Sequence, residues 1–172
     1  MKLLLVIDMQ NDFIDGALGT PEAAAIVADV AEHIRAFDGP VICTLDTHTE
    51  DYMHTAEGRS LPVVHCVKGT RGWELNSAIA KAAKDAGALL LTKPAFGSTE
   101  LPGVIRDDYP DVDSIEMVGI CTDICVISNA MILKAFLPEI PLSVDSSLCA
   151  GVTPEQHQNA LEAMKPCQIE II

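Results

Sequence analysis

The sequence predicts an α/β fold, a three-layer α/β/α arrangement around a six-stranded, mostly parallel sheet. Short apolar runs alternate along the chain with longer segments in which apolar residues recur at helical spacing. Apolar residues make up 49% of the 172 residues, enough to bury a large core. This alternation is typical of parallel sheets covered by helices on both faces. The length predicts one domain over residues 1–172.

The first strand is predicted at residues 2–7, where the apolar run KLLLVI stops at a charged residue. A helix follows over 21–37, because Thr20 is a preferred N-cap with proline directly after it. A Gly-Pro pair ends this helix, and VICTL at 41–45 forms the second strand. Residues 46–72 show no sustained period, which predicts a long loop of the kind that often carries function.

The second half of the chain continues the alternation. Asn76 and Thr153 favour the N-cap of a helix, and Thr122 is expected to cap the helix that follows the fourth strand. Further helices are expected at 76–86, 101–107, 122–136 and 154–164, and further strands at 88–92, 115–120, 140–144 and 167–172.

The charge balance excludes several classes of partner. The formal net charge is −14, from 11 Lys and Arg against 25 Asp and Glu, with no basic cluster. Such a surface repels phosphate backbones and anionic lipids, so neither nucleic acid nor a membrane is expected as a partner. The N-terminal apolar run is too short for a signal peptide and lacks a cleavage site. We therefore expect a cytoplasmic protein.

Chemically useful side chains follow the predicted strands directly. Sites on parallel sheets form at the carboxyl ends of the strands. Asp8, Asp46 and Lys93 occupy such positions, and so does the segment after Ile120. These positions therefore predict a functional site at one edge of the sheet.

Cys125 is the one cysteine of six whose context indicates chemistry, and the others are expected to be reduced thiols. It falls in the first turn of a helix, where N–H groups favour a thiolate and can hold an oxyanion. Asp8 could accept the thiol proton, and Lys93 could steady both groups. Each residue also has a plain structural interpretation: a small core residue, a loop carboxylate and a surface lysine.

The long loop contains a candidate metal site. Asp46, His48, His54 and His65 supply a carboxylate and three imidazoles, a set that suits zinc, iron or manganese. Asp46 and His48 are two apart, so both point the same way in extended chain. The alternative is that loop histidines are simply solvated.

Four segments resemble the isochorismatase-like cysteine hydrolases, and within them the nicotinamidases. They are DMQNDFIDGAL at 8–18, the DTH…H…HCVKGT stretch at 46–70, the strand-end lysine at 93 and GICTDIC at 119–125. The resemblance covers nearly the whole chain.

The resemblance implies specific roles. Asp8, Lys93 and Cys125 would form a catalytic triad. A cis peptide before Cys121 would turn its N–H toward the oxyanion, beside that of Cys125. A divalent metal, foremost zinc, would be held by the aspartate and three histidines of the loop. The implied activity is the hydrolysis of nicotinamide to nicotinate and ammonia, with a thioester on the cysteine.

The residues that would line the substrate pocket match the nicotinamidases less closely. Phe13 matches a residue that packs on the pyridine ring, whereas Pro62 stands where many nicotinamidases have tryptophan. Trp73 and Phe96 are candidates for another wall. Other small amides or ureido compounds stay open as substrates, as does a non-catalytic metal-binding protein. Relatives are often dimers or larger, which leaves a homo-oligomer open.

Overall fold

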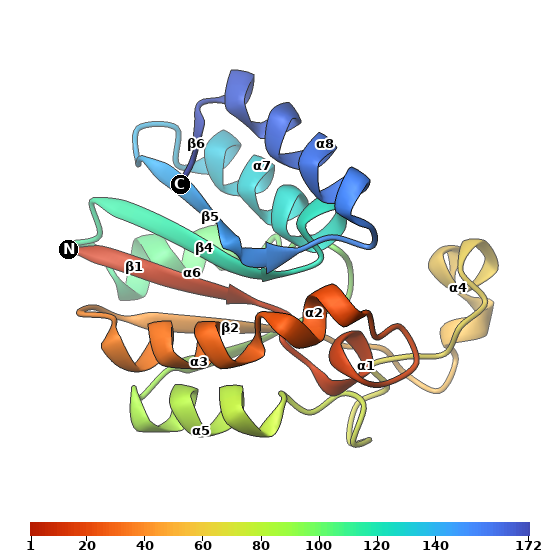
Figure 1. Ribbon diagram of the computed structural model, residues 1–172. Helices are drawn as coiled ribbons and strands as arrows, with labels where there is room; N and C mark the ends of the chain where they lie inside the picture. Colours follow the sequence, from red (N-terminus) through yellow and green to blue (C-terminus); the bar gives the residue numbers. More distant parts are fainter.

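The computed structural model describes all 172 residues and contains one six-stranded sheet (Figure 1). All five strand pairings are parallel, and the strand order is β3-β2-β1-β4-β5-β6. The strands are β1 (Lys2–Ile7), β2 (Val41–Asp46), β3 (Leu89–Lys93), β4 (Ser114–Ile120), β5 (Leu142–Ala150) and β6 (Ile169–Ile171). The predicted α/β class and six-stranded sheet are confirmed.

Helices cover both faces of the sheet (Figure 1). The first face carries α1 (Asn11–Ile14), α2 (Pro21–Ala25), α3 (Val27–Ala36) and α5 (Ser77–Asp85). The second face carries α6 (Leu101–Asp108), α7 (Ile127–Phe136) and α8 (Pro154–Met164). The short helix α4 (Ala56–Ser60) stands apart from both layers in the long loop after β2 (Figure 1). None of the helices combines the length and the apolar character that a membrane span requires.

The central strand β1 divides the hydrophobic core by the alternation of its side chains. Leu4 and Val6 pack with α3 and α5, whereas Leu3, Leu5 and Ile7 pack with the helices of the other face. All five side chains are fully buried. A strand buried on both faces reads as a continuous apolar run, which explains the unbroken sequence LLLVI.

The strand order reverses direction at β1. The chain builds outward through β2 and β3 on one side, then returns to place β4, β5 and β6 on the other. In open α/β sheets a crevice forms at such a switch point, outside the carboxyl ends of the strands. The ends of β1, β2, β3 and β4 therefore meet there.

Most predicted elements match the structure, with a few differences. The predicted helix over 21–37 is interrupted at Ile26 and forms α2 and α3. Asn76 and Thr153 cap their helices with side-chain oxygens. Thr122 does not cap a helix: it is the first residue of a π-helical turn, Thr122–Val126, and its hydroxyl lies 2.8 Å from His157 Nδ1. Strand β5 extends six residues beyond its predicted end at 144, through a polar stretch that apolar patterning does not reveal.

Candidate active site

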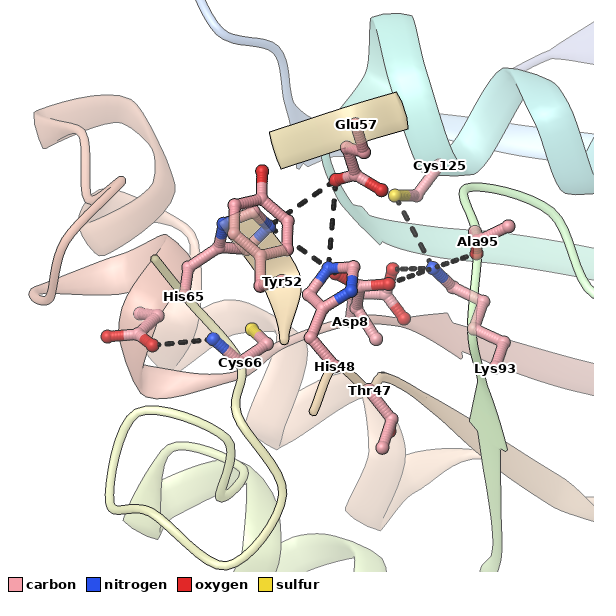
Figure 2. A network of polar contacts seen from close by, with 12 residues as sticks. Asp8, Thr47, His48, Tyr52, Glu57, His65, Cys66, Lys93, Ala95 and Cys125 are labelled. Carbon is pink, nitrogen blue, oxygen red and sulfur yellow. Dashed lines mark hydrogen bonds and ion pairs between the residues drawn. The ribbon is translucent and has the colours of Figure 1, made fainter. Parts of the chain in front are cut away.

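Asp8, Lys93 and Cys125 converge at the switch point of the sheet (Figure 2). Lys93 Nζ lies 2.6 Å from Asp8 Oδ2 and 3.5 Å from Cys125 Sγ. All three residues are buried. They reach this point from the ends of β1 and β3 and from the π-helical turn after β4. The three residues that the sequence singles out as a triad are thus in mutual contact.

The Asp8 carboxylate is held by a neighbouring strand. Thr44 Oγ1 donates to Asp8 Oδ1 at 2.6 Å and accepts from the Asp8 backbone N–H at 3.2 Å. Burial raises the carboxyl pKa, although Lys93 and Thr44 both oppose this shift. Asp8 Oδ2, close as it is to the ammonium, accepts no hydrogen bond of good geometry. One oxygen is therefore fixed, and the other is available to a proton.

The pKa of the Cys125 thiol lies well above its ordinary value, because the side chain is buried and faces Asp8. The expectation that the helix start favours a thiolate is therefore wrong for this arrangement. Burial and a facing carboxylate outweigh the N–H groups of one turn. A neutral thiol needs a base before it can act as a nucleophile, and the Asp8 carboxylate faces this thiol.

Lys93 remains charged despite its burial. Burial alone would lower its pKa, but the negative charges of Asp8 and Asp46, and of Cys125 when it is ionised, raise it. Its Nζ also donates to the carbonyl of Ala95 at 3.0 Å. The ammonium therefore sits at a fixed point between the carboxylates and the sulfur.

The segment around the cysteine is shaped by its backbone. The peptide bond between Ile120 and Cys121 is cis, as the family resemblance implies. Among the backbone hydrogen bonds outside helices and strands, none is donated by Cys121. Asn129 Nδ2 holds the Cys125 carbonyl at 2.8 Å, which ties the turn to the start of α7.

A second cluster adjoins the first through Asp46. Its Oδ1 lies 3.4 Å from Lys93 Nζ, and its Oδ2 lies 2.9 Å from His48 Nε2 and 3.6 Å from His65 Nε2. Glu57 Oε1 lies 3.6 Å from both imidazole nitrogens (Figure 2). One ligand atom from each of these four residues falls within 4.8 Å of all the others.

The donor set fits a divalent metal ion. His48 Nε2 is buried without a hydrogen-bond partner, so it is an orphaned polar atom aimed into the cluster. His65 Nδ1 bonds the Val63 carbonyl at 2.8 Å, which leaves its Nε2 facing the other three groups. A backbone acceptor on the second ring nitrogen is the usual support of a metal-binding histidine. Two imidazoles and two carboxylates suit zinc, iron or manganese.

The structure places Glu57, and not His54, in this cluster. His54 is exposed in a short 3₁₀ turn at 52–54, whereas Glu57 is half-buried in the first turn of α4. Thr55 caps α4 by accepting from the Gly58 N–H at 3.0 Å, and this start directs Glu57 inward. The predicted role of His54 is not supported, because the turn carries it away from the cluster. The sequence feature that could have indicated Glu57 is the capping threonine Thr55 followed two residues later by this glutamate.

The segment Gln10–Asp12 holds the ends of the long loop. The buried Gln10 amide accepts from the Asp46 N–H at 2.7 Å and donates to the Asp46 carbonyl at 2.8 Å. It also donates to the Trp73 carbonyl at 2.8 Å. Asp12 Oδ2 accepts from the Cys66 N–H at 2.8 Å, next to His65. The motif after β1 therefore positions both stretches that carry the residues of this cluster, a role that the sequence alone does not reveal.

A cavity of about 450 Å³ opens above Cys125 and reaches the metal cluster. Phe13 lines it, with its ring centroid 5.5 Å from that of His65, and Phe96 lines it on another side. Trp73 does not line it: its Nε1 donates to Thr47 Oγ1 at 2.8 Å, away from the cavity. The prediction for Trp73 as a wall is therefore wrong. Leu61, next to Pro62, lines the cavity.

The two histidines outside the long loop, His33 and His157, both make side-chain contacts. His33 Nε2 lies 2.6 Å from Oε1 of the buried Glu116, which also pairs with Lys2. His157 packs beside the site, with its Nδ1 against the Thr122 hydroxyl. Burial lowers the His157 pKa, so this imidazole is a neutral link between α8 and the turn.

Comparison with known proteins reveals relatives that match this chain over nearly their whole length. The sequence profile of the isochorismatase domain matches residues 2–172. The nicotinamidase/pyrazinamidase of Mycobacterium tuberculosis is 29% identical over 188 residues, which covers 100% of this chain and 98% of that protein. The pyrazinamidase of Pyrococcus horikoshii, solved in complex with zinc, is 30% identical with a TM-score of 0.80, covering 99% of this chain and 98% of that one. The yeast nicotinamidase shares the fold, with a TM-score of 0.86 at 21% identity, covering 100% of this chain and 99% of that one.

Proposed function

Because this chain belongs to the isochorismatase family, we propose that it is a metal-containing cysteine amidohydrolase that converts nicotinamide and water to nicotinate and ammonia. The observation that carries the proposal is the contact of Lys93 with both Asp8 and Cys125 at the floor of a cavity whose wall bears the metal cluster. The nicotinamidase and pyrazinamidase relatives support the substrate.

In the first half of the reaction, Asp8 accepts the thiol proton while Cys125 Sγ attacks the amide carbonyl carbon. The Lys93 ammonium stabilises the charge that passes between sulfur and carboxylate. The tetrahedral intermediate then breaks its C–N bond. Asp8 returns the proton to the leaving nitrogen, and ammonia departs from a thioester on Cys125.

In the second half, Asp8 takes a proton from water, and the water oxygen attacks the thioester carbonyl. The new intermediate breaks its C–S bond, and the sulfur regains its proton from Asp8. The carboxylic acid then leaves the site. Two moderate barriers replace one high barrier, which is the gain from a covalent nucleophile.

We assign the stabilisation of the oxyanion in both intermediates to the backbone N–H groups of Cys121 and Cys125, which would donate hydrogen bonds to it. Preorganised donors of this kind are among the larger contributions to catalysis, at roughly 10²–10³ in kcat for each donor. The uncommitted N–H of Cys121 supports the assignment.

Asp46, His48, Glu57 and His65 would hold the metal ion, for which zinc is the leading identity. When bound, the ion would supply a Lewis acid that accepts the pyridine nitrogen of the substrate. Phe13 would pack against the ring beside it. The protein's own contribution is to orient the amide over Cys125 and to exclude bulk water from the buried triad.

The test measures the metal content of protein purified without chelator, and ammonia release from nicotinamide before and after chelation and metal return. Metal-dependent release is the expected result. The Cys125→Ala protein should release no ammonia yet keep its metal, since Cys125 is not among the metal-binding groups. Turnover by that variant would contradict the nucleophile assignment, and bound metal without ammonia from the wild type would contradict the substrate.

A further inference from the structure

Five apolar side chains form the outer part of the active-site cavity, here called the outer chamber. It consists of Leu18, Leu61, Phe96, Ile124 and Val152. Three of them are strongly exposed for large apolar residues: Leu61 by 38%, Phe96 by 44% and Val152 by 42%. They come from three separate segments, and all face the space above Cys125.

Each of the three exposed residues has its backbone anchored to a residue close to the site. The Tyr52 hydroxyl donates to the Leu61 carbonyl at 2.9 Å, and the Tyr52 ring lies 4.9 Å from that of His65. The Val152 N–H donates to Asp123 Oδ1 at 3.0 Å, just before Ile124.

The anchor of Phe96 is shared with the proposed nucleophile. Asn129 Nδ2 donates to the Phe96 carbonyl at 3.2 Å and to the Cys125 carbonyl at 2.8 Å. The wall and the nucleophile are therefore held by the same amide. The backbone of each of these three wall residues is held in place before any ligand arrives, which lowers the entropic cost of ordering them on binding.

Apolar side chains that an anchored backbone holds open to water imply an apolar occupant, because a ligand that covers them removes their apolar surface from water. The cavity of about 450 Å³ lies within the roughly 300–1,000 Å³ typical of sites for ligands larger than a single ring. Outside the metal cluster its one acidic lining residue is Asp123, and no lysine or arginine lines it. An anionic substituent in the outer chamber is therefore disfavoured.

We propose that the enzyme prefers aromatic carboxamides that carry an uncharged apolar substituent on the ring, with Leu61 and Val152 as specificity-determining residues. The inference rests on the proposed amidohydrolase function. The amide lies over Cys125, and the substituent occupies the outer chamber between the long loop and the segment that precedes α8.

The test compares nicotinamide with a series of nicotinamides bearing a propyl group at each free ring carbon. At least one isomer should show a KM about tenfold lower, as expected for partial burial of three carbons. The corresponding propyl nicotinates, used as competitive inhibitors, should show the same gain over nicotinate. This second readout separates binding from chemistry. A nicotinamide that carries a carboxylate in place of the propyl group should bind more weakly than nicotinamide.

Two variants locate the effect, and a third is the matched control. Leu61→Gln and Val152→Gln each place a polar group in the chamber from a different segment, so each should remove most of the propyl preference. Leu90 is 54% exposed on β3 and does not line the cavity, so Leu90→Gln should keep the full preference. The compared quantity is the KM for the propyl amide divided by the KM for nicotinamide. This ratio is insensitive to loss of folded protein.

The two proposals fail in different ways. Hydrolysis of nicotinamide with no isomer that binds more tightly overturns the chamber assignment alone. A preference that survives in both glutamine variants also overturns it. Hydrolysis of a propyl amide but not of nicotinamide overturns the substrate named under the proposed function and keeps the chamber. If no amide is hydrolysed, both proposals are wrong.

Discussion

Individual side chains in this site have properties that depend on burial more than on sequence neighbours. Cys125 lies in the first turn after a strand, a position that favours an acidic thiol, yet the pKa of its thiol is raised. The cause is a facing carboxylate in a buried pocket. A local motif therefore indicates the candidate nucleophile, whereas its protonation state is decided by burial and by groups that arrive from β1 and β3.

The Thr44 hydroxyl should set the pH range of activity. Asp8 must be ionised to accept the thiol proton, so kcat/KM should fall as the pH drops through its raised pKa. Thr44→Val removes the 2.6 Å hydrogen bond that lowers this pKa. The acid limb should therefore move to higher pH by about one unit.

The control is Thr92→Val, which makes the same change at an exposed position on β3. A pH–rate profile of each protein measures the effect. An unmoved acid limb in Thr44→Val would show that Asp8 is not the group that limits activity in acid.

Glu57 and His54 offer a direct comparison of the structural and the sequence-based ligand sets. Glu57→Gln should weaken metal binding at least tenfold, whereas His54→Gln should leave it unchanged, because His54 is outside the cluster. Competition with a chelator of known affinity measures both. Loss of metal in His54→Gln with retention in Glu57→Gln would restore the histidine assignment.

At the scale of elements, the strands and their ends are readable from sequence, and the long loop is not. The positions of Asp8, Asp46 and Lys93 at strand ends can be predicted, because an apolar run marks each strand. Their ends meet because all strands run parallel. The loop residues have no such period. His65 is placed by a bond from Asp12 to the next residue, Cys66, 54 positions away in the chain. No local pattern encodes a contact of that range.

The segment after β1 should therefore control metal affinity without touching the metal. Gln10→Leu leaves the buried N–H and carbonyl of Asp46 without partners. Loss of this support should lower metal affinity by about 10–100-fold, as for other residues that orient a ligand. Metal titration of the folded variant is the measurement.

Gln158→Leu is the matched control, since Gln158 is exposed on α8 and bonds only Glu162 there. It should bind metal like the wild type. Equal affinity in Gln10→Leu would mean that Asp46 keeps its position without the amide, and the positioning role would be withdrawn.

At the scale of the whole molecule, the metal cluster joins distant parts of the fold. It links the end of β2, the helix α4 and the end of the long loop, so a bound ion stabilises the folded chain against an unfolded one. At a free metal concentration 100 times the Kd, the gain is about 2.7 kcal/mol. For a protein of this size the melting temperature should rise by roughly 5–10 °C.

Thermal unfolding with metal and with chelator measures this shift. Glu57→Gln at the same metal concentration should show a smaller rise, because one of the four ligands is lost. Equal melting temperatures with and without metal in the wild-type protein would show that the cluster does not bind the ion at that concentration.

The order of the site residues along the chain also bears on how the protein is made. Asp8, Lys93 and the four residues of the metal cluster all precede residue 94. The proposed nucleophile Cys125 comes later, as do the cavity residues Cys121, Ile124 and Val152. As the ribosome extends the chain, the metal-cluster residues therefore emerge first. The newborn protein receives its proposed nucleophile and much of the surrounding cavity wall together, in the later half of the chain.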